Sequence, residues 1–244
     1  MAPTIHLVRH AEGLHNVWSN GWDIKDPGLT ENGEEQCKNL SRTFPYMDKV
    51  THLIASPLRR TIQTCLQSFG PVVARGTQIV LLPELQEFGQ ETCNVGSEPE
   101  KLRLEFGYRV DLELVGKGWY DKGPNGAFAE RDREQREARA QNALEWLYSV
   151  SESAADDDHI VVVTHGVFVN VMLKDEESLS RRVFWRNAEY RSFRFVDSHD
   201  DPTSDAVLIE TDERYAKKRW RPNIYGRGNA ADTPLSLGKR AVVV

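Results

Sequence analysis

Residues that can bind anions or move protons gather in four short stretches of this chain. The stretches are "IHLVRHAEGLHN" (5–16), "SPLRRTIQT" (56–64), "PELQE" (83–87) and "VVVTHG" (161–166). Between them they supply Arg9, His10, Arg59, Arg60, Glu84, Glu87 and His165. Arg9 beside His10 brings together two side chains that are both cationic at mildly acid pH. Such a pair repels unless an anion lies between its members.

These residue types meet the demands of phosphoryl transfer. A guanidinium group can bind two phosphate oxygens at once, and helix N-termini add N–H donors. A neutral imidazole can attack phosphorus in line, while a carboxylic acid protonates the leaving oxygen. A metal site is the competing interpretation of two histidines and a glutamate. No histidine pair stands at i, i+4 on a predicted helix, however, and the arginines would repel a cation. We therefore expect a phosphate site without metal or other cofactor.

The segments that must position these residues alternate between strand and helix patterns. Short β-branched runs at 4–8, 50–55, 77–82 and 159–164 predict strands buried on both faces. Helices are predicted from 31 after Thr30 as cap, from Pro57 through Phe69, and over 129–151. This order predicts an α/β fold, a three-layer α/β/α sandwich around a mostly parallel sheet. Ligands bind at the carboxyl ends of such strands, where the four stretches should meet.

Two regions depart from the alternation. Residues 88–128 are rich in glycine, charge and isolated aromatics, and predict a partly helical insertion or lid over the functional edge. We assign this segment to a single domain that extends over residues 1–210. Residues 211–244 are basic at first and then punctuated by glycine and proline, which predicts an extension with little secondary structure.

Composition restricts the partners. A net charge of -6 and a pI near 5.7 argue against non-specific binding to nucleic acid or to anionic membranes. No apolar run approaches the ~20 residues of a membrane span, and the N-terminus lacks the pattern of a signal peptide. Cys37, Cys65 and Cys93 are odd in number and irregular in spacing, which favours a reducing compartment such as the cytoplasm. The sequence is compatible with a monomer and with a homodimer.

The four stretches, in this order, resemble the histidine phosphatase superfamily, in its phosphoglycerate-mutase-like branch. The family signature opens with Arg-His-Gly and places an asparagine six residues after the histidine, as Asn16 is here. "DPGLTENGEEQ" (26–36) and "WRNAEYRSF" (185–193) also resemble its eukaryotic phosphatase-like members. The resemblance extends over about residues 4 to 196.

The resemblance implies a role for each matched residue. His10 is expected to be the phosphorylated nucleophile, with Arg9, Arg60 and His165 binding the phosphate. Arg60 is preferred to Arg59 because the family arginine comes four residues after the serine, here Ser56.

The same resemblance assigns the proton donor and the substrate contacts. Glu87 is the expected donor because the family glutamate follows a leucine by two residues, and Glu84 is the alternative. Asn16 is expected to contact the phosphate or the substrate. Glu12 and Gly166 are expected to lie close to the site, whereas His15 is either a surface turn residue or a substrate contact.

Several other residues have a structural interpretation beside the functional one. Ala11 replaces the family glycine, which we expect to be tolerated if the backbone there has a negative φ. His6, His52 and His159 are expected to pack or to hydrogen-bond within strands. The loop aromatics are expected near the mouth of the site, either holding an apolar substrate group or anchoring the loops. They are Trp18, Trp22, Trp119 and Tyr120.

Three functions fit these residues. The first is a phosphatase that discharges a phosphohistidine to water, and the second a phosphoglycerate mutase that returns the phosphoryl group to its substrate. The third is a non-catalytic module that only holds a phosphorylated ligand. The mutases of the family surround the acid with Glu-Arg-His-Tyr-Gly, whereas this chain reads "QEFGQETCNVG" (86–96). Since all the expected catalytic residue types are present, we favour the phosphatase, acting on a phosphorylated small molecule.

Overall fold

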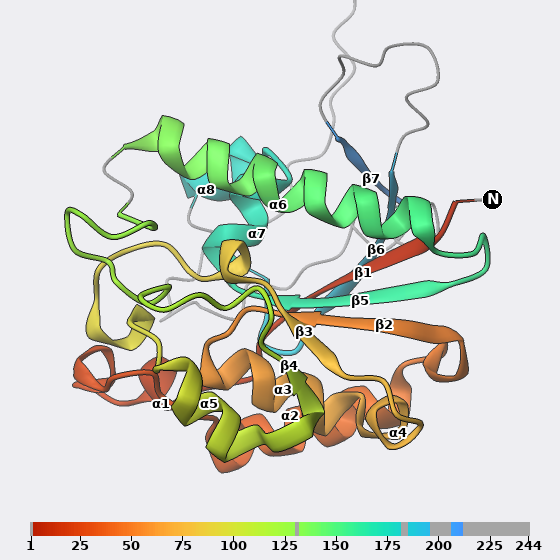
Figure 1. Cartoon of the computed structure of the whole chain (residues 1–244), viewed down its shortest axis with the longest axis horizontal. Helices are drawn as coiled ribbons and strands as arrows, with labels where there is room; N and C mark the ends of the chain where they lie inside the picture. The colour runs from red at the N-terminus through yellow and green to blue at the C-terminus, as the bar shows by residue number, and fades with distance from the viewer. Residues whose placement is uncertain (1, 130–131, 182–184, 196–205, 212–244) are drawn as a thin grey trace, which may run out of the picture.

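A seven-stranded sheet forms the centre of the molecule (Figure 1). The computed structural model describes residues 2–129, 132–181, 185–195 and 206–211. Its strands lie in the order β4-β3-β2-β5-β1-β6-β7. They are β1 (Thr4–Arg9), β2 (Val50–Ala55), β3 (Ile79–Leu81), β4 (Val110–Asp111), β5 (His159–Thr164), β6 (Tyr190–Phe195) and β7 (Leu208–Glu210).

The first five strands run parallel, and β6 and β7 are antiparallel to their neighbours. In the register of β1 with β5, Thr4 lies opposite His159 and Arg9 opposite Thr164. β2 lies on the other side of β5. The carboxyl ends of β1, β5 and β2 therefore meet at one edge of the sheet, as the alternation of segments predicted.

Helices cover both faces of the sheet (Figure 1). On one face lie α2 (Glu31–Thr43), α3 (Arg59–Ser68), α4 (Gly70–Ala74) and α5 (Pro99–Phe106). On the other lie α6 (Arg133–Ser153), α7 (Gly166–Met172) and α8 (Glu176–Arg181). The short α1 (Leu14–Val17) and the 3-10 helices belong to the connections; the latter are η1 (Gly21–Asp23), η2 (Met47–Lys49), η3 (Pro83–Leu85), η4 (Thr92–Asn94) and η5 (Gly107–Arg109). The α/β/α sandwich is thus confirmed.

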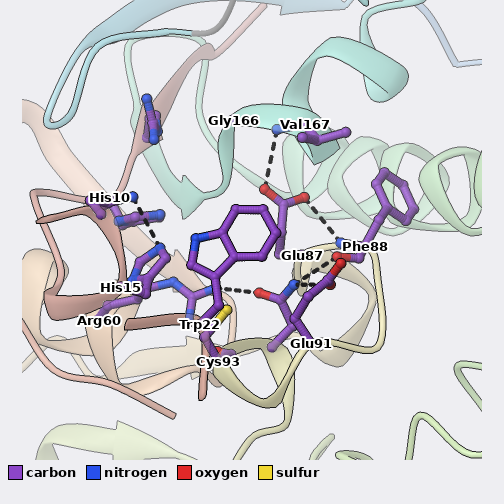
Figure 2. A pocket seen from close by; sticks show the side chains of 13 residues that line it. His10, His15, Trp22, Arg60, Glu87, Phe88, Glu91, Cys93, Gly166 and Val167 are labelled. Carbon is purple, nitrogen blue, oxygen red and sulfur yellow. Dashed lines mark hydrogen bonds between the residues drawn. The ribbon is translucent and has the colours of Figure 1, made fainter. Parts of the chain in front are cut away.

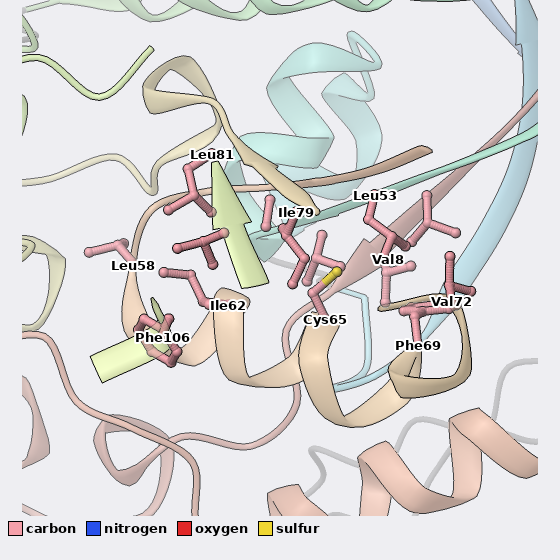
Figure 3. Close-up of a cluster of buried hydrophobic side chains, with 14 of the residues drawn as sticks. Val8, Leu53, Leu58, Ile62, Cys65, Phe69, Val72, Ile79, Leu81 and Phe106 are labelled. Carbon is pink, nitrogen blue, oxygen red and sulfur yellow. The ribbon is translucent and has the colours of Figure 1, made fainter. Parts of the chain in front are cut away.

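Each face of the sheet has its own apolar core. Figure 3 shows the cluster in which side chains of the strands pack on α3 and on α5, including Ile62 and Phe106. On the other face, Leu144 and Leu147 of α6 pack with Phe168 of α7. Burial of such side chains stabilises the fold by about 1.5–3 kcal/mol each, which holds the strand ends in a fixed relation.

Some boundaries differ from the predicted ones. α3 begins at Arg59 rather than at Pro57, and α6 begins at Arg133 rather than near 129. β3 is shorter than the apolar run 77–82. Thr30 caps α2 as predicted, because its side chain accepts a hydrogen bond from the Gly33 N–H.

Residues 88–128 contain α5, two 3-10 helices and the edge strand β4. Most of this segment is integrated into the core, where Leu102, Val115 and Trp119 are buried. The segment approaches the functional edge of the sheet through residues 88–94. The predicted extension over 211–244 lies outside the described residues except for Thr211, so this prediction and the domain limit at 210 are untested.

Candidate active site

Two histidines stand side by side at the functional edge of the sheet. His10 follows β1 and His165 follows β5, and their ring centroids lie 5.2 Å apart. The His10 N–H donates to the Thr164 carbonyl oxygen at 2.9 Å, which extends the strand register by one residue. Both side chains are almost completely buried.

The tautomer of His10 follows from its contacts. Nδ1 lies 2.7 Å from the carbonyl oxygen of Ala11. A carbonyl oxygen only accepts hydrogen bonds, so Nδ1 carries the proton and Nε2 keeps the lone pair in the neutral ring. Ala11 has a negative φ, and its N–H donates to Thr64 Oγ1 at 2.9 Å. Alanine therefore fits the backbone at the position where the family has glycine.

Arg60 and Arg59 start the same helix but do different things. Arg60 is buried, and its guanidinium donates to the Cys93 carbonyl oxygen at 2.8 Å and to Asn94 Oδ1 at 3.0 Å. Arg59 points away and forms a paired contact with the Glu105 carboxylate. The Arg59 N–H donates to the buried Asp26 carboxylate at 2.9 Å, which caps the helix and fixes both arginines.

Arg9 completes the cationic side of the site. Its guanidinium donates to the carbonyl oxygen of Trp185. A Cβ on Gly166 would lie 3.2 Å from Arg9 Nε, closer than most such contacts. Glycine at 166 therefore lets the N-terminus of α7 approach this guanidinium.

Glu87 is oriented by backbone donors. Its Oε1 accepts from the N–H groups of Phe88 and Phe168, each at 3.0 Å, and its Oε2 accepts from the Val167 N–H at 3.2 Å. Glu84 has a different environment. It lines a separate hollow with residues of α6, so the structure does not support it as the alternative acid.

Three further predicted residues belong to the loop and the short helix that follow β1. His15 lies with its ring centroid 5.4 Å from that of His10, and its Nε2 lies 3.2 Å from Asn16 Nδ2. Asn16 Oδ1 accepts from the Gly13 N–H at 3.0 Å. Glu12 does not join them. Its carboxylate accepts from the Thr30 hydroxyl at 2.7 Å, which ties the loop to the start of α2.

These side chains line one cavity of about 310 Å³ (Figure 2). Its walls are formed by Arg9, His10, His15, Asn16, Trp22, Arg60, Glu87, Phe88, Glu91, Cys93, Asn94, Gly166 and Val167. His165 is not among the residues that line the cavity. Its Nε2 lies 2.9 Å from the Ser56 hydroxyl oxygen. The cavity thus brings together the predicted site residues except Glu12 and His165, and the His165 ring lies 5.2 Å from that of His10.

Four nitrogens at this site are buried without a hydrogen-bond partner among the described residues. They are Arg9 Nε, His15 Nδ1, Arg60 Nε and His165 Nδ1. Buried donors are rarely left unsatisfied in folded proteins, because each costs about 1–3 kcal/mol. Arg9, His15 and Arg60 line the cavity, so a tetrahedral anion bound there would supply oxygen acceptors of the kind that these buried nitrogens lack.

Burial and positive neighbours keep the histidines neutral. Burial lowers the pKa of His10 well below its ordinary 6.5, and the guanidiniums of Arg60 and Arg9 lower it further. Burial and Arg60 also lower the pKa of His165 well below 6.5. The pKa of His15 falls to about 3 for the same reasons, burial being the largest. His10 therefore has its lone pair available at neutral pH.

The predicted aromatics separate into two groups. Trp22 lines the cavity and is 61% exposed, whereas Trp119 is buried in the core, where its indole N–H donates to the Ser97 carbonyl oxygen. Trp119 does not line the cavity; it anchors its loop to the core, which is the second of the two roles expected for these aromatics. His6 and His159 bond to each other at 2.7 Å within the strands, as expected.

Five lining residues escaped the sequence analysis: Phe88, Glu91, Cys93, Asn94 and Val167. Phe88 and Val167 directly follow matched motifs, so extending each motif by one residue would have found them. Cys93 and Asn94 bind Arg60 across 33 and 34 positions of sequence. No local pattern indicates such a contact.

The sequence profile of the histidine phosphatase superfamily (branch 1) matches residues 5–201. This chain belongs to that superfamily. Among curated relatives, a phosphoglycerate mutase-like protein of Arabidopsis thaliana is 26% identical over 83% of this chain and 88% of its own. A probable phosphatase of Schizosaccharomyces pombe is 33% identical, over 42% of this chain and 49% of its own.

Solved structures agree on the fold of this histidine phosphatase. The ecdysone phosphate phosphatase of Bombyx mori, in complex with tungstate, superposes with a TM-score of 0.57 over 94% of this chain and 98% of its own. Its sequence is 15% identical, so this similarity concerns the architecture. Within the described residues, no helix is both long and apolar enough to cross a bilayer.

Proposed function

We propose that this histidine phosphatase hydrolyses phosphate monoesters of small molecules without a metal ion, through a phosphohistidine on His10. The observation that carries the proposal is the set of four unpartnered buried nitrogens around a neutral imidazole with an available Nε2. The phosphatase among its relatives supports the same activity.

In the first step, His10 Nε2 attacks phosphorus while Arg9, Arg60 and His165 bind the phosphate oxygens. The bond from phosphorus to the ester oxygen breaks as the N–P bond forms, and the leaving oxygen takes a proton from Glu87. We place that proton on Oε2, whose single contact to the Val167 N–H is the longer one at 3.2 Å. Oε1 keeps its two N–H partners throughout.

In the second step, water attacks the phosphohistidine. The Glu87 carboxylate takes a proton from this water, the N–P bond breaks, and its electron pair returns to Nε2. The products are the alcohol and inorganic phosphate, and both His10 and Glu87 return to their starting forms. The arginines neutralise the phosphoryl charge in both steps, which is the role that a metal ion has in other phosphatases.

Hydrolysis of an aryl phosphate, with and without a chelator, tests the proposal. We expect chelator-resistant release of phosphate by the wild type and a loss of at least about 10³-fold in His10→Ala. Activity that survives in His10→Ala would remove His10 as nucleophile. Conversion of 3-phosphoglycerate without phosphate release would instead establish a mutase, and phosphate binding without turnover a non-catalytic module.

Location and assembly are separate proposals. Cys37, Cys65 and Cys93 are all buried free thiols, which supports a reducing compartment, the cytoplasm. Light scattering on the purified protein decides between a monomer and a homodimer.

A further inference from the structure

We propose that the cavity contains an apolar subsite for the alcohol part of the substrate, formed by Trp22, Phe88 and Val167 and bordered by Glu91. It selects phosphate esters of aromatic or aliphatic alcohols and disfavours those with a second negative charge. This inference deepens the proposed function and rests on the assignment of Glu87 as acid.

The place of the alcohol follows from the place of the acid. A proton donor must lie within hydrogen-bond distance of the leaving oxygen, so the alcohol part begins beside Glu87. The Glu87 carboxylate is held by the N–H groups of Phe88 and Val167. Both residues also line the cavity, and the group attached to the leaving oxygen therefore extends along them.

Trp22 supplies the largest apolar surface of the subsite. It lies in η1, which contacts η4 (Thr92–Asn94), and so it belongs to the same wall as Glu91 and Cys93. Figure 2 shows its indole between the His10–His15 side and the Glu87–Phe88 side. The indole is 61% exposed, an unusual state for tryptophan, which gains free energy when a flat apolar group covers it.

The charges of the cavity oppose a second anion. Among the described residues that line it, Arg9 and Arg60 carry its positive charges, and both belong to the phosphate end. At the other end, Glu91 accepts a hydrogen bond from Asn94 Nδ2 at 3.2 Å. Lys25 and Lys122 line a different hollow, and the Lys122 ammonium, which donates to the Glu87 carbonyl oxygen at 3.1 Å, does not line this cavity. Among the described side chains that line the cavity beside Trp22, Glu91 carries a negative charge and none is cationic, so a substrate carboxylate placed there would be repelled.

Two aryl esters that differ by one charge test the selectivity. The substrates are phenyl phosphate and 4-carboxyphenyl phosphate. The carboxylate makes the phenol the better leaving group, so chemistry alone favours the charged ester. We expect the wild type to prefer phenyl phosphate by at least tenfold in kcat/KM. Equal or inverted preference would overturn the inference.

Matched variants assign the effect to named side chains. Trp22→Ala should lower kcat/KM for phenyl phosphate by roughly 10- to 100-fold. Trp18→Ala is the control, since Trp18 is 55% exposed in the neighbouring turn but does not line the cavity. Glu91→Gln keeps an acceptor for Asn94 and should raise kcat/KM more for the carboxylated ester than for phenyl phosphate. Equal effects of the two tryptophan variants would contradict the subsite.

Binding of the corresponding phosphonates separates this inference from the proposed function. Phenylphosphonate and 4-carboxyphenylphosphonate are not hydrolysed, so their affinities report the subsite alone. If no ester is turned over but phenylphosphonate binds at least tenfold more tightly than 4-carboxyphenylphosphonate, the phosphatase proposal fails and the subsite stands. If the two phosphonates bind equally, the subsite is wrong whatever the activity.

Discussion

The imidazole rings of His10 and His165 lie 5.2 Å apart, centroid to centroid, because they follow neighbouring parallel strands in register. Arg9 pairs with Thr164 in that register, and the His10 N–H continues it. The distance between the proposed nucleophile and the proposed phosphate-binding histidine is thus set by two central strands of the sheet. Such support is what a site needs when its groups must meet phosphorus in a fixed geometry.

Replacing Arg60 with lysine should lower kcat/KM on the order of 100-fold. Lysine keeps the positive charge but lacks the planar guanidinium, which donates to the Cys93 carbonyl oxygen and to Asn94 Oδ1 and can bind phosphate oxygens at the same time. Arg59→Lys is the matched control, because Arg59 binds Glu105 outside the cavity, and it should change activity less than threefold. Steady-state kinetics with an aryl phosphate measure both. Similar losses in the two variants would argue against Arg60 as phosphate ligand.

Glu87→Gln should affect substrates according to their leaving group. An alkoxide leaves only with a proton, so hydrolysis of alkyl phosphates should fall about 10²- to 10⁴-fold. A nitrophenolate needs no proton, so formation of the phosphohistidine from nitrophenyl phosphate should fall much less. A rapid-quench measurement of this first step shows the difference. A uniform loss for both substrates would assign Glu87 to positioning instead of proton transfer.

The fold should become less stable as the pH falls below about 6.5. Histidines titrate near this value in an unfolded chain, whereas burial lowers the folded-state pKa of His10 and His165, and that of His15 to about 3. Between the two pKa values the unfolded chain binds more protons. Each such histidine therefore lowers the free energy of unfolding by about 1.4 kcal/mol per pH unit of acidification.

Urea denaturation at pH 7.5, 6.5 and 5.5 measures this dependence. His165→Gln should reduce the slope, because one neutral buried histidine is removed. A free energy of unfolding that is constant from pH 7.5 to 5.5 would contradict the buried neutral histidines.

Gly33→Ala should disturb the active-site loop from outside the cavity. A Cβ at Gly33 would lie 2.1 Å from the Glu12 carbonyl oxygen, so the loop after β1 must shift. We expect a loss of about 1–3 kcal/mol in stability together with lower kcat. At Gly116 a Cβ meets nothing within 4 Å and φ is not in the left-handed region, so Gly116→Ala should be neutral or slightly stabilising. Thermal unfolding and kinetics compare the pair.

Much of the architecture could be predicted because its signals are local. Val161, Val162 and Val163 form a run that only a strand buried on both faces accommodates. Once such strands are placed, the residue after each of them is at the functional edge. His10 and His165 could therefore be placed together from the sequence, and the structure puts them there.

The remainder depends on contacts between distant segments. β6 carries Arg191 and Arg194 among its apolar residues, so it gave no clear strand pattern, and β4 has two residues. Trp119 seemed to belong to a surface loop, but the adjoining segments of 88–128 bury it. Glu12 is in the signature stretch, yet its carboxylate binds Thr30 because α2 begins beside it. None of these packing relations is encoded in a short pattern.

Trapping the phosphoenzyme tests the central claim most directly. The protein is mixed with a nitrophenyl phosphate, quenched in base within milliseconds and digested, and the phosphorylated peptide is sequenced by mass spectrometry. We predict a base-stable, acid-labile phosphate on His10, absent in His10→Ala and longer-lived in Glu87→Gln, which cannot activate water. Phosphate release by the wild type with no label on His10, or with label on another residue, would contradict the mechanism.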